Sequence, residues 1–219
     1  MKRWMFRALW KDEQTRGEAW AQVHASALDA HLKSRKVSVC HWFAGAGGLY
    51  IYAETEEAEE PSVIPRDMAL QFLQMWPGYP ESKPAALMMD VFHDGEPASM
   101  DSWRGSRKVE RRVGSLARLK PEMYSSYVYY HYQMQEERPS GFNQTYRIGA
   151  HENMLFSYFE LPASLEYPKR EARLKTNHTP QDWHAVMLPH FIPWEAEDEE
   201  AEPALWRELQ LIYQYERLD

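Results

Sequence analysis

The chain has little cysteine, no long apolar run and no excess of basic residues. One cysteine among 219 residues, Cys40, excludes an internal disulfide and suits a reducing compartment. It stands in an apolar stretch, so we expect it to be buried rather than to act as a nucleophile. The N-terminal sequence MKRWMFRALWKDE has no stretch apolar enough for a signal peptide or a membrane span. We therefore expect a soluble cytoplasmic protein with no membrane partner.

The charge balance argues against a second class of protein, those that bind nucleic acid or anionic membranes. A formal net charge of −8 argues against binding to nucleic acid or to an anionic membrane, because both require a basic surface. The basic run at residues 104–112 (RGSRKVERR) is the local exception, and it is typical of a solvated linker, with phosphate binding as a distant second interpretation.

Metal and phosphate sites also lack their sequence signatures. His178, His184 and His190 follow one another at intervals of six, which does not put them on one face of a helix. The glycine-rich stretch GAGG at residues 45–48 has no helix after it, so it predicts a hairpin turn rather than a phosphate-binding loop. We expect no metal ion and no cofactor.

What the chain does contain is an internal repeat. Residues 6–54 and 114–160 each run from an apolar strand into a helix with an aromatic residue four positions before a histidine, and then into two strands around a tight turn. The aromatic–histidine pairs are Trp20 with His24 and Tyr127 with His131. A period near 110 residues is too long for a solenoid and fits two copies of one small domain.

Periodicity and turn residues predict the same order of elements in both halves. The first half is expected to contain strands at 3–10, 36–43, 49–54 and 85–93 and helices at 17–34 and 66–76. The second is expected to contain strands at 114–119, 143–148, 153–160 and 205–215 and two helices. One of these helices opens at Pro121, and the other follows an N-cap at Thr179 and ends at Met187.

This order predicts an α+β fold of two tandem ferredoxin-like repeats, each β-α-β-β-α-β. The expected boundaries are residues 1–105 for the first repeat and 113–219 for the second. A four-stranded sheet of this kind leaves one face uncovered, so two copies can bury these faces against each other. The prediction is a dimeric-type α/β barrel formed within one chain.

We expect the chemistry on the helix that opens at Pro121, which carries the tyrosine–histidine pair of the second half. Tyr127 and His131 are four residues apart, so on a helix their side chains share a face. Histidine changes protonation near neutrality and tyrosine holds its proton more tightly, and such a pair can serve acid–base catalysis. The pattern is also common by chance, and on a tyrosine-rich helix most such residues pack or face solvent, so the motif alone favours a packing role.

Four segments of the second half resemble the L-rhamnose mutarotase family, which is made of small ferredoxin-like proteins that pair to form an α/β barrel. The segments are RLKPEMYSSYVYYH, YRIGAHENMLFSYFE, QDWHAVMLP and LWRELQLIYQYE, and they cover most of residues 117–216. The resemblance implies a sugar isomerase that interconverts the α and β anomers of a rhamnose-like monosaccharide without a cofactor.

The resemblance also assigns site residues by position. The helix tyrosine and histidine of the family fall on Tyr127 and His131, and its hairpin tyrosine falls on Tyr146. Its Trp-Trp pair falls on Trp183 and His184, so the second tryptophan is replaced. The family's Asn-Pro-x-Trp-Pro stretch is also absent, and YQMQEE stands at residues 132–137. The family thus implies His131 and Tyr127 as catalytic residues and Tyr146, Trp183 and His184 as substrate-binding residues.

The first half resembles the family less. His24 is retained, but Trp20 stands in place of the tyrosine and Cys40 aligns with Tyr146. We therefore expect the first repeat to complete the barrel and the second to keep the chemistry.

Two other functions stay open. One is a non-catalytic sugar-binding or interaction protein. The other is a cofactor-free monooxygenase-like protein or a haem-handling protein, because the same barrel fold carries these activities and a fold does not fix a function. The sequence does not name the sugar, and it leaves open a homodimer of the fused barrel.

Overall fold

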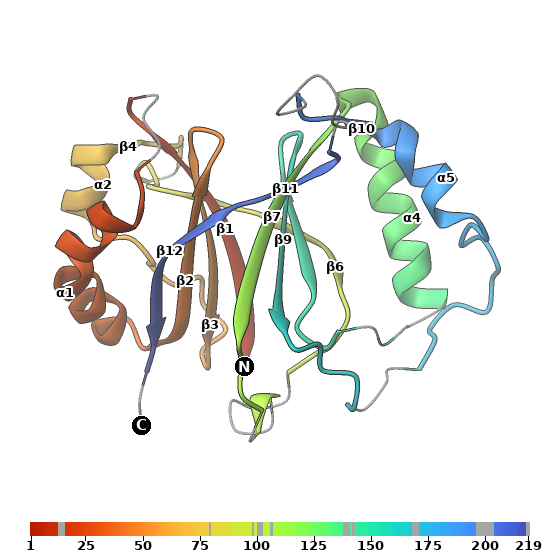
Figure 1. Ribbon diagram of the computed structural model, residues 1–219, viewed down its shortest axis with the longest axis horizontal. Helices are drawn as coiled ribbons and strands as arrows, with labels where there is room; N and C mark the ends of the chain where they lie inside the picture. The colour runs from red at the N-terminus through yellow and green to blue at the C-terminus, as the bar shows by residue number, and fades with distance from the viewer. Residues whose placement is uncertain are drawn as a thin grey trace. The chain divides into compact units, whose positions relative to one another are not determined.

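The computed structural model describes residues 1–12, 16–78, 80–97, 99, 103–105, 107–137, 141, 143–167, 171–195 and 204–217. Its contacts divide the chain into two compact units. Unit 1 consists of Met1–Met88, Pro97–Arg107 and Leu209–Asp219, and unit 2 consists of Met89–Glu96 and Lys108–Glu208. The fold is α+β with two antiparallel sheets, as the sequence predicts (Figure 1).

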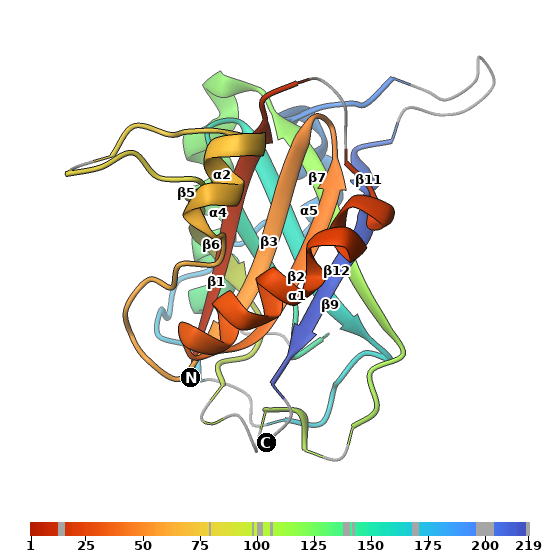
Figure 2. The same ribbon diagram turned by 90° about the vertical axis from the view of Figure 1, so that its left-hand side faces the viewer.

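The sheet of unit 1 has the strand order β12-β2-β3-β1-β4, with β5 paired to β1 as well. Helices α1 and α2 lie across one face of this sheet (Figure 2). The elements of unit 1 are β1 (Lys2–Trp10), α1 (Glu18–Ser34), β2 (Val37–Gly45), β3 (Gly48–Thr55), α2 (Arg66–Phe72), β4 (Leu73–Gln74), β5 (Ala86–Leu87) and β12 (Gln210–Glu216).

The sheet of unit 2 has the order β6-β8-β9-β7-β10, with β11 paired to β7 as well. Helix α4 packs against this sheet and α5 lies beside α4 (Figure 1). The elements of unit 2 are β6 (Met89–His93), β7 (Arg111–Leu119), the 3₁₀ helix η1 (Pro121–Met123), α4 (Tyr124–Glu137), β8 (Arg147–His151), β9 (Met154–Leu161), α5 (Trp183–Met187), the 3₁₀ helix η2 (Leu188–His190), β10 (Phe191–Ile192) and β11 (Trp206–Glu208).

The boundaries expected from the sequence, 1–105 and 113–219, differ from this division because two strands are exchanged. The predicted strand 85–93 breaks at Met88: β5 pairs with β1 in unit 1, and β6 pairs with β8 in unit 2. The predicted strand 205–215 breaks at Leu209: β11 pairs with β7 in unit 2, and β12 pairs with β2 in unit 1. A strand pattern gives the faces of a strand but not which of two similar sheet edges it joins.

The predicted hairpin of unit 1 is confirmed. Gly45 pairs with Gly48, and the two residues between them, Ala46 and Gly47, have φ values of 47° and 69°. Two successive residues with positive φ make the turn that matches the twist of a β-hairpin. Because glycine adopts this conformation without steric cost, GAGG specifies the turn.

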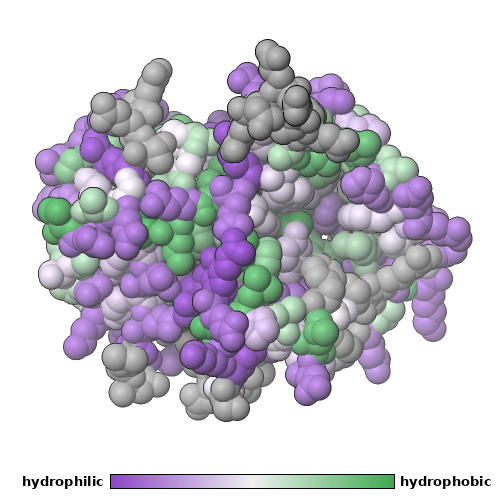
Figure 3. All heavy atoms as spheres, viewed as in Figure 1, coloured by the Kyte–Doolittle hydropathy of each residue, from purple (hydrophilic) through white to green (hydrophobic). Residues whose placement is uncertain are grey.

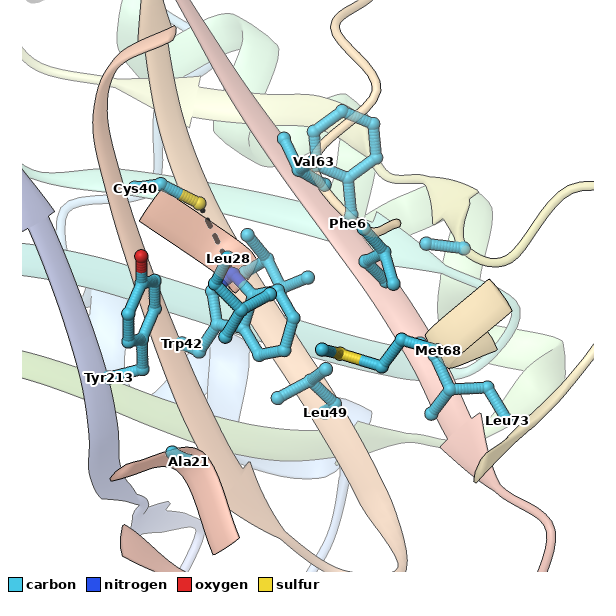
Figure 4. Close-up of a cluster of buried hydrophobic side chains, with 14 of the residues drawn as sticks. Phe6, Ala21, Leu28, Cys40, Trp42, Leu49, Val63, Met68, Leu73 and Tyr213 are labelled. Carbon is cyan, nitrogen blue, oxygen red and sulfur yellow. Dashed lines mark hydrogen bonds between the residues drawn. The ribbon is translucent and has the colours of Figure 1, made fainter. Parts of the chain in front are cut away.

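The core of unit 1 lies between its sheet and its two helices (Figure 4). Trp42 is fully buried there, near Leu28 and Leu49. Its indole Nε1 donates to the sulfur of Cys40 at 3.2 Å, and burial raises the pKa of that thiol to about 12. Cys40 is therefore a packing residue, as expected.

The first residue of the basic run, Arg104, forms a buried ion pair, so the expectation that this run is a solvated linker is wrong at this position. Arg104 does not point into solvent: its guanidinium bonds both oxygens of the fully buried Glu54, at 2.7 and 2.8 Å. Arg3 lies over the ring of Trp103, 4.9 Å from its centroid.

On the face drawn in Figure 3, hydrophilic residues are interspersed with smaller hydrophobic areas.

Candidate active site

Helix α4 brings the predicted catalytic pair together. Pro121 opens the 3₁₀ turn before it, and Tyr127 and His131 then lie one turn apart on the buried face. Their ring centroids are 4.0 Å apart. Tyr127 is 1% exposed and His131 is 4% exposed.

One hydrogen bond fixes the tautomer of His131. Its Nδ1 lies 2.9 Å from the carbonyl oxygen of Tyr127. A carbonyl oxygen can only accept, so Nδ1 carries the proton and Nε2 keeps a lone pair. Among the residues that the structure describes, this Nε2 has no hydrogen-bond partner. Burial lowers the pKa of His131 to about 4, so the ring is neutral at neutral pH and its Nε2 presents a lone pair.

Tyr146 and Trp183 complete the site predicted from the sequence. The Trp183 ring meets that of His131 edge-on, with centroids 4.9 Å apart. Tyr146 is near enough to Tyr127 to act on it electrostatically. Both are half-buried, so they form the accessible edge of the group. We call Tyr127, His131, Tyr146 and Trp183 the His131 cluster.

The two phenols of the His131 cluster keep their protons at neutral pH. Burial raises the pKa of Tyr146 to about 12. Burial, together with the neighbouring Tyr146, raises the pKa of Tyr127 well above its ordinary value. Both hydroxyls are therefore hydrogen-bond donors rather than bases.

The exchanged strand β6 contributes one further side chain. Phe92 lies 6.1 Å from His131 and 6.0 Å from Tyr146, between ring centroids. Residue 92 precedes the second half of the sequence, so the expected domain boundary excluded it from this site.

His184, the remaining predicted binding residue, does not join the His131 cluster. Its side chain is exposed on α5, next to the inward-facing Trp183. Helix α5 also begins later than expected: it starts at Trp183, and the Asp182 side chain accepts the Ala185 N–H at 3.0 Å as the N-cap. Thr179 is therefore not a helix cap.

Thr179 instead belongs to a clamp around Glu137, the last residue of α4. The Glu137 carboxylate accepts from the N–H of His178 at 2.9 Å and from the N–H and hydroxyl of Thr179 at 2.7 and 2.6 Å, and it also bonds the hydroxyl of Thr176. Burial acts to raise the pKa of this carboxyl, but these donors outweigh it and lower the pKa to about 2. The clamp attaches the segment that leads to Trp183 to the end of α4.

The sequence did not single out His190 for this site. It is 2% exposed, and its ring lies 6.1 Å from that of Tyr127. Its Nε2 is 2.8 Å from the Ser126 hydroxyl. Three histidines at intervals of six gave no periodic signal, and only the fold brings this one to α4.

An open hollow lies at the start of α4. It has a volume of about 620 Å³ and is lined by Pro121, Tyr124, Ser125, Glu152 and Asn153. Tyr124 is one turn before Tyr127 and packs against the same core.

A repeated strand feature allows the two units to be compared residue by residue. Tyr52 donates to the buried Glu54 at 2.7 Å on β3, and Tyr158 donates to the buried Glu160 at 2.9 Å on β9. The two tyrosines and the two glutamates thus occupy corresponding places in their sheets.

The register extends this comparison to the site. Residue 41 pairs with Tyr52 and residue 147 with Tyr158, so the residues before them, Cys40 and Tyr146, correspond. Leu73 and Phe191 each pair with the last residue of β1 or β7, so the residues before them, Phe72 and His190, correspond as well.

Unit 1 therefore has an aromatic cluster without the polar partners. Trp20 and His24 lie 4.6 Å apart, and Phe72 lies 5.3 and 5.4 Å from them, between ring centroids. Cys40 replaces the phenol of unit 2.

Comparison of the chain with known proteins found no matching family model, no matching curated protein and no matching solved structure. In the described part of the chain, no helix is long and apolar enough to cross a membrane. Within those same residues, no group of three His, Cys, Asp or Glu side chains is arranged to hold a metal ion.

Proposed function

We propose that the protein is a carbohydrate mutarotase that interconverts the α and β anomers of a rhamnose-like monosaccharide. The observation that carries the proposal is the meeting of Tyr127, His131, Tyr146 and Trp183, which come from three separate parts of unit 2: helix α4, the residue before β8, and helix α5. The proposal includes the architecture: two ferredoxin-like repeats that form a dimeric-type α/β barrel. The matching strand orders of the two sheets support a duplication.

The reaction needs one proton acceptor and one proton donor. We assign the acceptor to Nε2 of His131, which takes the proton of the anomeric hydroxyl. A proton delivered to the ring oxygen lets the C1–O bond of the ring break, and the C1 hydroxyl becomes an aldehyde. Rotation about the bond between C1 and C2, followed by the reverse steps, gives the other anomer. This exchange also runs in water, so a modest acid–base contribution is sufficient.

The other side chains bind and orient. The protonated Tyr146 donates to a sugar hydroxyl, and Tyr127 holds the His131 ring through its carbonyl oxygen. Trp183 offers an aromatic face to the apolar face of the sugar.

Saturation-transfer NMR tests this function on deoxy- and aldohexoses, with L-rhamnose first. We expect the exchange rate to rise in proportion to protein concentration for at least one sugar, and His131→Ala to remove this rise. Exchange at the buffer rate for every sugar would reject the enzyme. Sugar-dependent shifts of the His131 resonances without exchange would identify a non-catalytic sugar-binding protein.

A further inference from the structure

His190 is held in place by its ring and by its backbone. Its ring contacts those of Tyr127 and Tyr130, with centroids 6.1 and 6.0 Å away. Its carbonyl oxygen accepts the N–H of Lys120 at 2.9 Å. These contacts fix the ring of His190 beside the tyrosine that also contacts His131.

The hydrogen bonds of Ser126 determine which nitrogen of His190 carries the proton. The Ser126 hydroxyl donates to the carbonyl oxygen of Met123 at 3.0 Å. A serine has one hydroxyl proton, so the contact at 2.8 Å is a donation from Nε2–H of His190 to the Ser126 oxygen. In neutral His190 the lone pair therefore belongs to Nδ1.

This Nδ1 is buried and, within the described part of the chain, has no hydrogen-bond partner. An unpaired buried polar atom is unfavourable, and a ring without nitrogen would avoid it. Unit 1 has such a ring at the corresponding place, Phe72. Packing alone therefore does not require a histidine here, and the spare nitrogen is available to bind a proton.

The two histidines also act on each other electrostatically. Burial lowers the pKa of His131 most, and a positive charge on His190 lowers it further. Within the described ranges, the titratable side chains that face His190 are Tyr127, Tyr130 and His131, all from α4. Like charges close together disfavour double protonation, so one proton on the pair leaves the other ring neutral.

We propose that His131 and His190 form one acid–base pair around Tyr127, in which His190 is the proton donor and His131 is the proton acceptor. The assignment of these roles to a sugar reaction rests on the proposed function. An acid–base pair needs two groups whose environments make one protonated and the other neutral at the same pH, because one group then gives a proton while the other takes one.

The assignment balances the reaction. Nε2 of His131 takes the proton of the anomeric hydroxyl, and the electrons of that O–H bond form the carbonyl bond at C1. The electrons of the C1–O ring bond go to the ring oxygen, which takes the proton from Nδ1 of His190. Closure on the other face returns both protons, so neither an oxidant nor a cofactor is consumed.

Two variants test the pair. His190→Phe installs the residue that unit 1 carries at this place, and His190→Gln keeps a polar side chain that does not titrate near neutrality. For both we expect the exchange rate at saturating sugar to fall by about 100-fold, the lower range for a lost acid–base group. His24→Gln, the histidine variant of unit 1, serves as the control and should match the wild type.

A second readout does not depend on activity. In histidine NMR titrations, both His190 variants should move the midpoint of His131 to higher pH, because the nearby positive charge is gone. Exchange within twofold of the wild type, or an unmoved His131 midpoint, would overturn the pair. A wild type without exchange, but with the midpoint shift in the variants, would reject the mutarotase function and keep the acid–base pair.

Discussion

The Nδ1 of His131 donates to the carbonyl oxygen of Tyr127 at 2.9 Å, and the two rings lie 4.0 Å apart. One side chain thus uses the backbone of the other to fix its tautomer. The lone pair that remains on Nε2 is the feature on which the proposed chemistry depends.

The first prediction concerns the pH dependence of stability. The pKa of His131 is lowered from 6.5 to about 4 by burial, so the unfolded chain takes up this proton before the folded chain does. The stability that the neutral, buried His131 gives the fold is complete above pH 6.5 and is lost as the pH falls from 6.5 through about 4. A pKa difference of one is worth about 1.4 kcal/mol, so the loss is on the order of 3 kcal/mol. Urea titrations between pH 7 and 4 should show a flatter decline for His131→Gln; equal slopes would contradict this.

Glu137 is expected to act in a lower pH window. Its pKa in the fold is lowered to about 2, so the carboxylate stabilises the fold above its ordinary pKa of 4.5, and this effect fades as the pH falls towards 2. Glu137→Gln should lower the urea midpoint at pH 6, and the difference from the wild type should shrink towards pH 2. Equal midpoints at pH 6 would mean that the clamp does not stabilise the fold.

The ion pair between Arg104 and Glu54 is expected to matter more than a surface pair. Glu54 is fully buried, so Arg104→Ala leaves its carboxylate without its counter-charge. Breaking such a pair costs about 3–5 kcal/mol, which denaturant unfolding would detect. Lys36→Ala is the matched control, because the pair of Lys36 with Glu57 is exposed and should change the midpoint little. Equal effects would show that Arg104 is not paired in solution.

Cys40 provides a chemical test of the core of unit 1. Its thiol is buried and its pKa is raised to about 12, so little thiolate forms at pH 8. A thiol reagent should leave the native protein unlabelled and label one site in urea. Rapid labelling of the native protein would contradict this packing.

The sequence was a good guide wherever the signal is local. The four-residue spacing of Tyr127 and His131 predicted their shared face, and GAGG predicted the turn at Ala46 and Gly47. In both cases neighbouring residues determine the conformation.

The sequence did not predict features that depend on residues far apart in the chain. Thr179 before a proline matches a helix start, but Glu137 of α4 competes for its hydroxyl and N–H. Phe92 reaches the site because β6 pairs with β8 of the second sheet, and His190 reaches it because the chain after α5 comes back to α4. Neither contact leaves a periodic pattern in the sequence.

The most direct test of the account is the anomeric exchange rate of L-rhamnose with equal concentrations of wild type, His131→Gln and His24→Gln. The account predicts that wild type and His24→Gln accelerate the exchange equally and that His131→Gln falls to the buffer rate. Equal acceleration by all three proteins, or none by the wild type, would contradict it.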